Sequence, residues 1–222
     1  MSTPILYSLR QCPYAIRARL GLYFAQIQVE LREVDMKNKP RDMLKISAKG
    51  TVPLLVLPNG DYLDESLEIM VWALNQHDPN NLLLEDDPHH FADMLSLIAK
   101  FDSKFIPALE RYKAAARYHD LDIELRRHQC EILLKDLEQR LCKTPFIMGQ
   151  HPSLVDYALL PFIRQFSKVE RHWYLESPYP LIRQWLTVHF QNPAFSLVMK
   201  QYDKWSDSHD FHKTVLCNHS SD

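Results

Sequence analysis

The feature that most constrains the fold is a change in hydrophobic periodicity near residue 77. Before it, short apolar runs at 5–7 and 29–34 read as strands, the second because apolar and charged residues alternate. Apolar residues between the two runs recur at spacings of three and four, as on one face of a helix: Ile16, Leu20, Tyr23, Phe24 and Ile27. This strand–helix–strand unit predicts two parallel strands joined by a right-handed crossover.

The rest of the chain divides into a short α/β part and a long helical part. Residues 54–57 and 62–63 predict a hairpin with Asn59-Gly60 as its turn, and a helix over about 66–76 follows. This order of elements is that of a thioredoxin-like domain, which we expect over residues 1–78. Beyond a linker rich in proline and asparagine at 78–88, all patterns are helical. We therefore predict an all-α C-terminal domain over 89–205, with its first helix bent or interrupted at Pro107, and a polar tail over 206–222.

Composition excludes several classes of function. The chain has only four glycines, at well-separated positions, whereas phosphate-cradling loops need several close together. A formal net charge of −2 offers no attraction for nucleic acid or an anionic membrane. No apolar run is long enough to cross a membrane, and no basic segment followed by an apolar stretch opens the chain. We predict a cytoplasmic protein with neither a nucleic-acid nor a membrane partner.

A cysteine followed by proline stands between the first strand and the first helix. Pro13 suits the first helical position, so Cys12 lies at the N-terminus of the helix. Thiols placed there lose their proton more readily than a free thiol, and the thiolate is the nucleophile of disulfide exchange. Ala15 stands where a dithiol redox protein has its second cysteine, which favours a mixed disulfide with an external thiol. The alternative is a buried cysteine that acts as a small hydrophobe.

Two further segments suggest a peptide-binding site. In a thioredoxin-like domain a cis-proline precedes the hairpin, and Pro53 is at that place, so the backbone of Val52 can pair with an extended ligand. Glu65 and Ser66 open the next helix, where an acid can bind an ammonium group and a helix N-terminus can bind a carboxylate. Together they suit an α-amino acid group such as the γ-glutamyl end of glutathione. The alternative is a plain helix start with Ser66 as N-cap.

At these residues the chain resembles the cytosolic glutathione S-transferase family, in its cysteine-type, omega-like and glutaredoxin-like branch. The resemblance covers about residues 4–205 and is carried by the segments 6–20, 36–40, 52–53 and 65–66. It includes a capping box, Ser153 to Asp156, in the helical half. The sequence departs from the omega class in lacking a longer N-terminal extension and in having Tyr14 where that class has phenylalanine.

The resemblance implies a function and a set of site residues. Cys12 is the catalytic residue, and Tyr7, near the catalytic tyrosine of other classes, is structural. Glutathione is the cosubstrate, the partner is a small electrophilic or disulfide substrate, and the protein is a homodimer. The activity implied is thiol transfer, that is, the reduction of glutathione mixed disulfides, with dehydroascorbate as a further candidate substrate. The implied glutathione-binding residues are Tyr14, Lys39, Val52, Pro53, Glu65 and Ser66, with Lys39 on the glycine carboxylate.

Other candidates are weaker. A non-catalytic interaction or regulatory protein on the same fold, like the stringent starvation protein or the chloride intracellular channel proteins, is the alternative function. We predict no metal site, because the histidine clusters lack paired ligand spacing. Cys130 reads as core, and Cys142 and Cys217 have no assigned role. Aromatic residues for a second-substrate pocket are candidates only, since such stripes are usually core: Phe101, Phe105, Tyr112, Trp173 and Tyr174.

Overall fold

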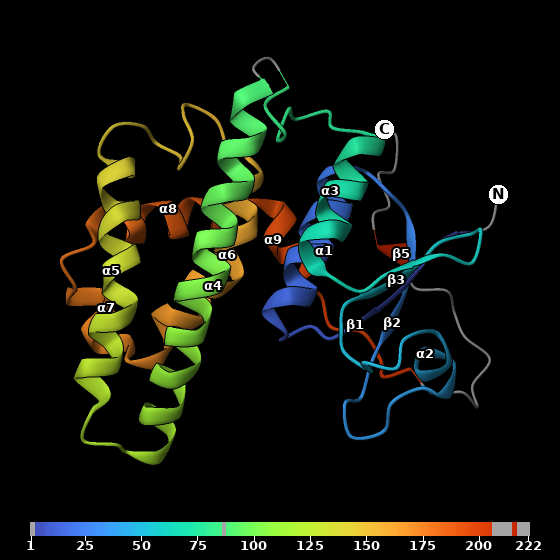
Figure 1. Ribbon diagram of the computed structural model, residues 1–222, viewed down its shortest axis with the longest axis horizontal. Helices are drawn as coiled ribbons and strands as arrows, with labels where there is room; N and C mark the ends of the chain where they lie inside the picture. The colour runs from blue at the N-terminus through green and yellow to red at the C-terminus, as the bar shows by residue number, and fades with distance from the viewer. Residues whose placement is uncertain (1–2, 86–87, 206–214, 217–222) are drawn as a thin grey trace. The chain divides into compact units, whose positions relative to one another are not determined.

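The computed structural model describes residues 3–85, 88–205 and 215–216 (Figure 1). The chain forms two compact units. The first comprises the residues up to Asn80 together with those from Asn192 onward, and the second comprises Asn81–Gln191. The α/β thioredoxin-like fold of the first and the all-helical fold of the second confirm the predicted fold class.

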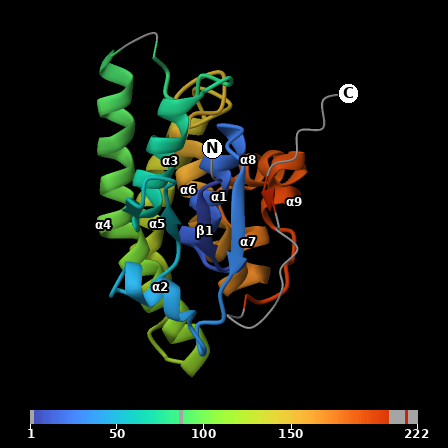
Figure 2. The ribbon, with the colours of Figure 1, turned by 90° about the vertical axis from the view of Figure 1, so that its right-hand side faces the viewer.

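The first unit is built on a mixed sheet. Its elements in chain order are β1 (Ile5–Ser8), α1 (Pro13–Phe24), β2 (Val29–Glu33), α2 (Arg41–Ile46), β3 (Leu54–Val56), β4 (Tyr62–Leu63) and α3 (Ser66–Gln76). β1 runs parallel to β2 and antiparallel to β3, and β3 is antiparallel to β4. α1 and α3 lie on one face of the sheet and α2 lies on the other (Figures 1 and 2).

Two glycines have a clear structural reason in this unit. Gly60 turns the β3–β4 hairpin with a φ of +93°, and its N–H donates to the Leu57 carbonyl. Gly21, which no sequence pattern explains, lies where α1 crosses α3. A Cβ at Gly21 would stand 2.7 Å from the Cα of Met70. The two helices therefore pack with almost no space between their backbones.

The end of the chain returns to the first unit. α9 (Pro193–Val198) packs against α1, and β5 (Val215–Leu216) pairs antiparallel with β2, which extends the strand order to β4-β3-β1-β2-β5. The sequence-based division placed residues up to 205 in the helical domain and expected only a polar tail beyond. The structure differs because long-range hydrogen bonds, not local periodicity, attach this segment: Arg19 donates to the Val198 carbonyl at 3.0 Å.

The second unit contains α4 (Pro88–Tyr118), α5 (Ile123–Leu141), α6 (Leu154–Val169), α7 (Arg171–Glu176) and α8 (Pro180–Gln191). α4 and α5 pack side by side, and α6 is buried along most of its length. Of the two effects predicted at Pro107, a bend or an interruption, the interruption is wrong, because α4 continues through this residue. Buried neighbours on both sides, Phe105, Ile106, Ala108 and Leu109, hold the helix together there. Within the described residues no helix is long and apolar enough to cross a bilayer.

Candidate functional site

Cys12 occupies the N-cap of α1, with Pro13 as the first helical residue. The Cys12 N–H donates to the Leu9 carbonyl at 3.0 Å, which closes the turn between β1 and the helix. Its side chain is half-buried and does not cap the helix by a hydrogen bond. The sulfur is therefore held beside the N–H groups of the first turn, where a negative charge is favoured.

The sulfur faces the segment that the sequence singles out as a peptide-binding backbone. The Val52–Pro53 peptide bond is cis, as predicted. Cys12 Sγ lies 3.7 Å from the Val52 carbonyl oxygen, to which the thiol donates. Tyr7 is 1% exposed, and its hydroxyl accepts a hydrogen bond from Arg32 at 2.7 Å. That burial agrees with the structural role predicted for Tyr7.

The start of α3 differs from a plain serine-capped helix. Glu65 is the N-cap, its side chain makes no capping hydrogen bond, and Ser66 is the first helical residue, 4% exposed. Lys49 Nζ donates to the Glu65 carboxylate at 3.0 Å and to the Asp64 carboxylate at 3.1 Å. These two hydrogen bonds, to Glu65 and then to Asp64, raise the pKa of Lys49. Glu65, which we expect to bind the ammonium group of a ligand, thus already pairs with the ammonium group of Lys49.

Two other predicted residues lie in the same unit. Lys39 is half-buried and its side chain reaches the loop before Val52. If Gly50 had a Cβ, that atom would lie 3.3 Å from Lys39 Nζ. Gly50 has a φ of +55°, a left-handed conformation that glycine adopts without strain. Tyr14 lies in the first turn of α1 and is 40% exposed.

Sequence reasoning missed Lys49, Glu33 and Arg19. Glu33 accepts a hydrogen bond from the Arg10 N–H at 2.6 Å, two residues before Cys12. Its other oxygen pairs with Arg19, a fully buried cation, at 2.5 Å. No spacing rule joins these residues, and burial of charged side chains at Arg19 and Glu33 is the signal that reveals them once the fold is known.

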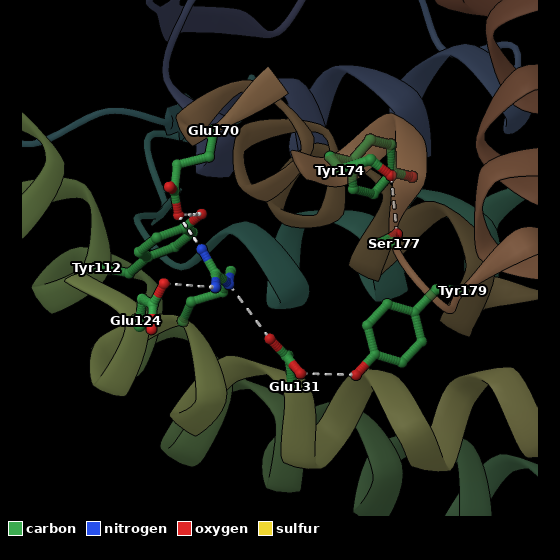
Figure 3. A network of polar contacts seen from close by, with 8 residues as sticks. Tyr112, Glu124, Glu131, Glu170, Tyr174, Ser177 and Tyr179 are labelled. Carbon is green, nitrogen blue, oxygen red and sulfur yellow. Dashed lines mark hydrogen bonds and ion pairs between the residues drawn. The ribbon is translucent and has the colours of Figure 1, made fainter. Parts of the chain in front are cut away.

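The candidate residues of the second unit have structural roles. The rings of Phe101 and Phe105 are stacked in the core, with their centroids 4.3 Å apart. Tyr112 donates to the Glu170 carboxylate (Figure 3), which also accepts from Arg127 at 2.6 Å. The Arg127 guanidinium lies over the Trp173 ring. Burial, reinforced by Glu170, raises the pKa of Tyr112. The polar network therefore accounts for Tyr112 and Trp173, and core packing accounts for Phe101, Phe105 and Tyr174, which is 2% exposed and has its ring beside that of Phe166.

The remaining cysteines and histidines add no site. Cys130 is fully buried, and burial raises the pKa of its thiol to about 12, in agreement with a core role. Cys142 is exposed. Over the described ranges there is no group of three or more metal-ligating side chains. One of the histidine clusters that the sequence contains lies outside the described residues: His209, His212, Cys217 and His219.

The start of α6 contains the predicted capping box. Asp156 is fully buried and accepts from the Ser153 N–H and hydroxyl, both at 2.9 Å. Its second oxygen accepts from the Ile147 N–H and from the Trp185 indole at 2.8 Å. Burial raises the pKa of Asp156, and these hydrogen bonds oppose that shift. The residue thus joins three segments of the helical unit: the start of α6, the loop at Ile147 and α8.

Comparisons with known proteins agree with this architecture. Omega-1 glutathione S-transferase from Sus scrofa is 28% identical over 193 residues, which cover 86% of this chain and 78% of that protein. The probable glutathione S-transferase DHAR1, cytosolic, from Oryza sativa subsp. japonica is 26% identical over 167 residues, covering 75% of this chain and 72% of that protein. The crystal structure of glutathione transferase Omega 3C from Trametes versicolor has the same fold, with a TM-score of 0.76 at 23% identity, covering 93% of this chain and 87% of that one.

Family descriptions match both halves of the chain. The N-terminal domain of glutathione S-transferases matches residues 6–81, and their C-terminal domain matches residues 133–187. The first match corresponds to the thioredoxin-like part of the first unit and the second to the helical unit. Because the two matches together cover more than half of the chain, it belongs to the glutathione S-transferase family.

Proposed function

We propose that this protein is an omega-type glutathione transferase that works as a thiol transferase and glutathione-dependent reductase, with Cys12 as its catalytic residue. The observation that carries the proposal is the position of Cys12 Sγ, at the N-terminus of α1 and 3.7 Å from the carbonyl of the cis Val52–Pro53 segment. A tyrosine-type mechanism has less support, because Tyr7 is 1% exposed.

The reaction proposed has two thiol–disulfide exchanges. The Cys12 thiolate attacks the glutathione sulfur of a mixed disulfide, the old S–S bond breaks, and the substrate leaves as a thiolate that takes a proton from water. The thiolate of a second glutathione then attacks the glutathione sulfur bound to Cys12. Oxidised glutathione leaves and the Cys12 thiolate is regenerated, so each cycle converts one mixed disulfide and one glutathione thiol into the free substrate thiol and oxidised glutathione.

Glutathione is the cosubstrate of the family, and this chain offers a group for each part of it. We assign its cysteine backbone to Val52 and Pro53, its glycine carboxylate to Lys39, and its γ-glutamyl group to Glu65 and Ser66, with Tyr14 at the rim. Replacing Lys39 by alanine should raise the Michaelis constant for glutathione more than it lowers kcat, since the lysine binds a part of the ligand remote from the reacting sulfur. An unchanged Michaelis constant contradicts that assignment.

A homodimer and a cytoplasmic location complete the proposal. Both rest on the family resemblance, and the rice relative is described as cytosolic. Sedimentation at micromolar concentration should give twice the mass of 26.2 kDa, and a sedimenting monomer contradicts the dimer.

The test of the catalytic assignment is steady-state turnover of a glutathione mixed disulfide by three proteins. Cys12→Ser should reduce turnover by at least about a thousandfold, because serine is not ionised at neutral pH and forms no disulfide. Cys142→Ser, which removes an exposed thiol outside the first unit, is the matched control and should keep wild-type turnover. Retained turnover in Cys12→Ser contradicts the assignment, whereas an absence of turnover in the wild-type protein favours the alternative of a non-catalytic interaction or regulatory protein. Dehydroascorbate is the second substrate to assay with the same three proteins.

A further inference from the structure

Glu33 links the loop that carries Cys12 to the end of the chain. Its carboxylate accepts from the Arg10 N–H at 2.6 Å and from Arg19 at 2.5 Å, and it is only 7% exposed. Its main-chain carbonyl accepts from the Trp205 N–H at 2.7 Å. One residue at the end of β2 therefore contacts the active-site loop on one side and residue 205 on the other.

Arg19 makes a second connection of the same kind. From its buried position in α1 it donates to the Ser8 hydroxyl at 2.8 Å, to Glu33, and to the Val198 carbonyl at 3.0 Å. Ser8 ends β1, immediately before the turn that leads to Cys12. Arg19 and Val198 are 179 residues apart in sequence, so this contact forms only after the end of the chain has returned.

Side chains of the C-terminal segment (residues 192–205) strengthen the attachment. The backbone of Lys204 forms an isolated parallel β-bridge with that of Glu33, and the Lys204 Nζ donates to the Asp35 carboxylate at 2.7 Å. The Trp205 ring lies 4.0 Å from the Arg32 guanidinium. The segment thus packs against α1 through α9 (Figure 1) and meets the end of β2 at Glu33 through Lys204 and Trp205.

We propose that Glu33 and the C-terminal segment are positioning elements of the Cys12 site: Glu33 holds the Arg10 N–H and so fixes the loop 8–12, and the C-terminal segment holds Glu33 and Arg19. The inference rests on the proposed function only in taking Cys12 as the reacting thiol. When the loop is released, Cys12 Sγ leaves the N-terminus of α1 and loses the stabilisation of its thiolate.

The test uses alkylation of the full-length protein by iodoacetamide across pH 5–10, with Cys12 and Cys142 followed by peptide mass spectrometry. The exposed Cys142 lies in the other unit and is an internal reference thiol. Alkylation needs no glutathione. A loss of glutathione binding therefore tests the proposed function, and a change in the Cys12 alkylation profile tests the positioning role.

Two matched double variants isolate the contact to Arg10. Arg19→Met/Glu33→Gln and Arg19→Met/Glu33→Leu both remove the buried ion pair, so neither leaves an uncompensated buried charge. Only the first keeps an acceptor for the Arg10 N–H. We expect the second to shift the midpoint of Cys12 alkylation upward by about one pH unit relative to the first, with about tenfold slower reaction at pH 6. Equal profiles in the two variants overturn the role of Glu33.

A third variant tests the C-terminal segment through residues that are less critical for folding. Lys204→Met/Trp205→Ala removes the ion pair with Asp35 and the contact with Arg32. At pH 6 this variant should show alkylation of Cys12 slowed about threefold relative to that of Cys142. Lys45→Met/Tyr62→Ala is the control, because it removes a similar exposed ion pair, with Asp42, and an exposed aromatic of the same unit. Identical ratios of the Cys12 and Cys142 alkylation rates in the two proteins overturn the contribution of the Lys204 and Trp205 side chains to this role, and thermal melting verifies that each variant is folded.

Discussion

The first turns of α1 and α6 present the same backbone groups and use them in opposite ways. At α6 the capping box includes the fully buried Asp156, whose oxygens accept hydrogen bonds from Ser153 in the same helix start and from Ile147 and Trp185 in two other segments. At α1 the N-cap is Cys12, half-buried, with no side-chain capping bond. A helix start whose backbone N–H groups are capped by side chains of the same chain contributes stability. A helix start whose N-cap is a thiol without a capping hydrogen bond can instead stabilise a reacting thiolate.

The largest difference between the two sites should appear in stability. Asp156→Ala leaves the buried donors of Ile147, Ser153 and Trp185 without an acceptor, and it should lower the free energy of unfolding by at least about 3 kcal/mol. Cys12→Ala should lower it by about 1 kcal/mol or less. Urea unfolding measures both. Asp136→Ala, at a partly exposed carboxylate in the same unit, is the control, and a loss at Asp136 equal to that at Asp156 contradicts the comparison.

The α6 site should also make stability depend on pH. Burial lowers the pKa of His189 from 6.5 to about 4, and its Nε2 lies 4.0 Å from Asp156 with no hydrogen-bond partner among the described residues. The unfolded chain therefore takes up a proton at this histidine before the folded chain does. The stabilisation is complete above pH 6.5 and is lost as the pH falls towards 4, by up to about 3 kcal/mol.

His189→Phe should remove most of that slope, because phenylalanine keeps the aromatic contacts with Trp185 and Tyr157 and has no titrating group. Chemical unfolding at several pH values between 4 and 7 provides the measurement. Exposed His172 provides the control, since His172→Gln should retain the wild-type slope. A wild-type slope in His189→Phe would refute the linkage.

The α1 site depends on close packing of its helix rather than on a cap. Gly21→Ala places a Cβ 2.7 Å from the Met70 Cα and should lower the free energy of unfolding by about 1–3 kcal/mol. Gly149→Ala is the matched control, because a Cβ at Gly149 meets no atom within 4 Å, and its effect should stay within about 0.5 kcal/mol. If both glycines tolerate alanine equally, the close approach of α1 and α3 is not a constraint.

The smallest effect is expected at α3, where Lys49 pairs with Glu65, the acid to which we assign the γ-glutamyl ammonium group. The ligand must displace an exposed ion pair, so Lys49→Met should lower the dissociation constant of S-methylglutathione by up to about fivefold. Calorimetry at low salt measures this, and added salt should narrow the difference. Lys45→Met, which breaks the exposed pair with Asp42, should leave binding unchanged. Weaker binding in Lys49→Met indicates that the lysine contacts the ligand instead of competing with it.

What could be predicted from the sequence is what local pattern encodes. Periodicity identified the strand–helix order, and Cys12-Pro13 and Ser153 to Asp156 marked two helix starts, because caps and turns are formed by neighbours in the chain. The cis bond at Pro53 followed from its place in the fold. Contacts between residues distant in sequence were not predictable, such as the hydrogen bond from Arg19 to Val198 and the ion pair of Lys49 with Glu65. The continuation of α4 through Pro107 was not predictable either, because tertiary packing overrides the local preference of proline.

The most direct test of the central claim is the mass of the native protein after incubation with oxidised glutathione, followed by peptide mapping. The account predicts addition of one glutathione, on Cys12, and no addition to Cys12→Ser under the same conditions. Buried Cys130 should stay unmodified. Glutathione on Cys142 or Cys217, with Cys12 left as a free thiol, would contradict it.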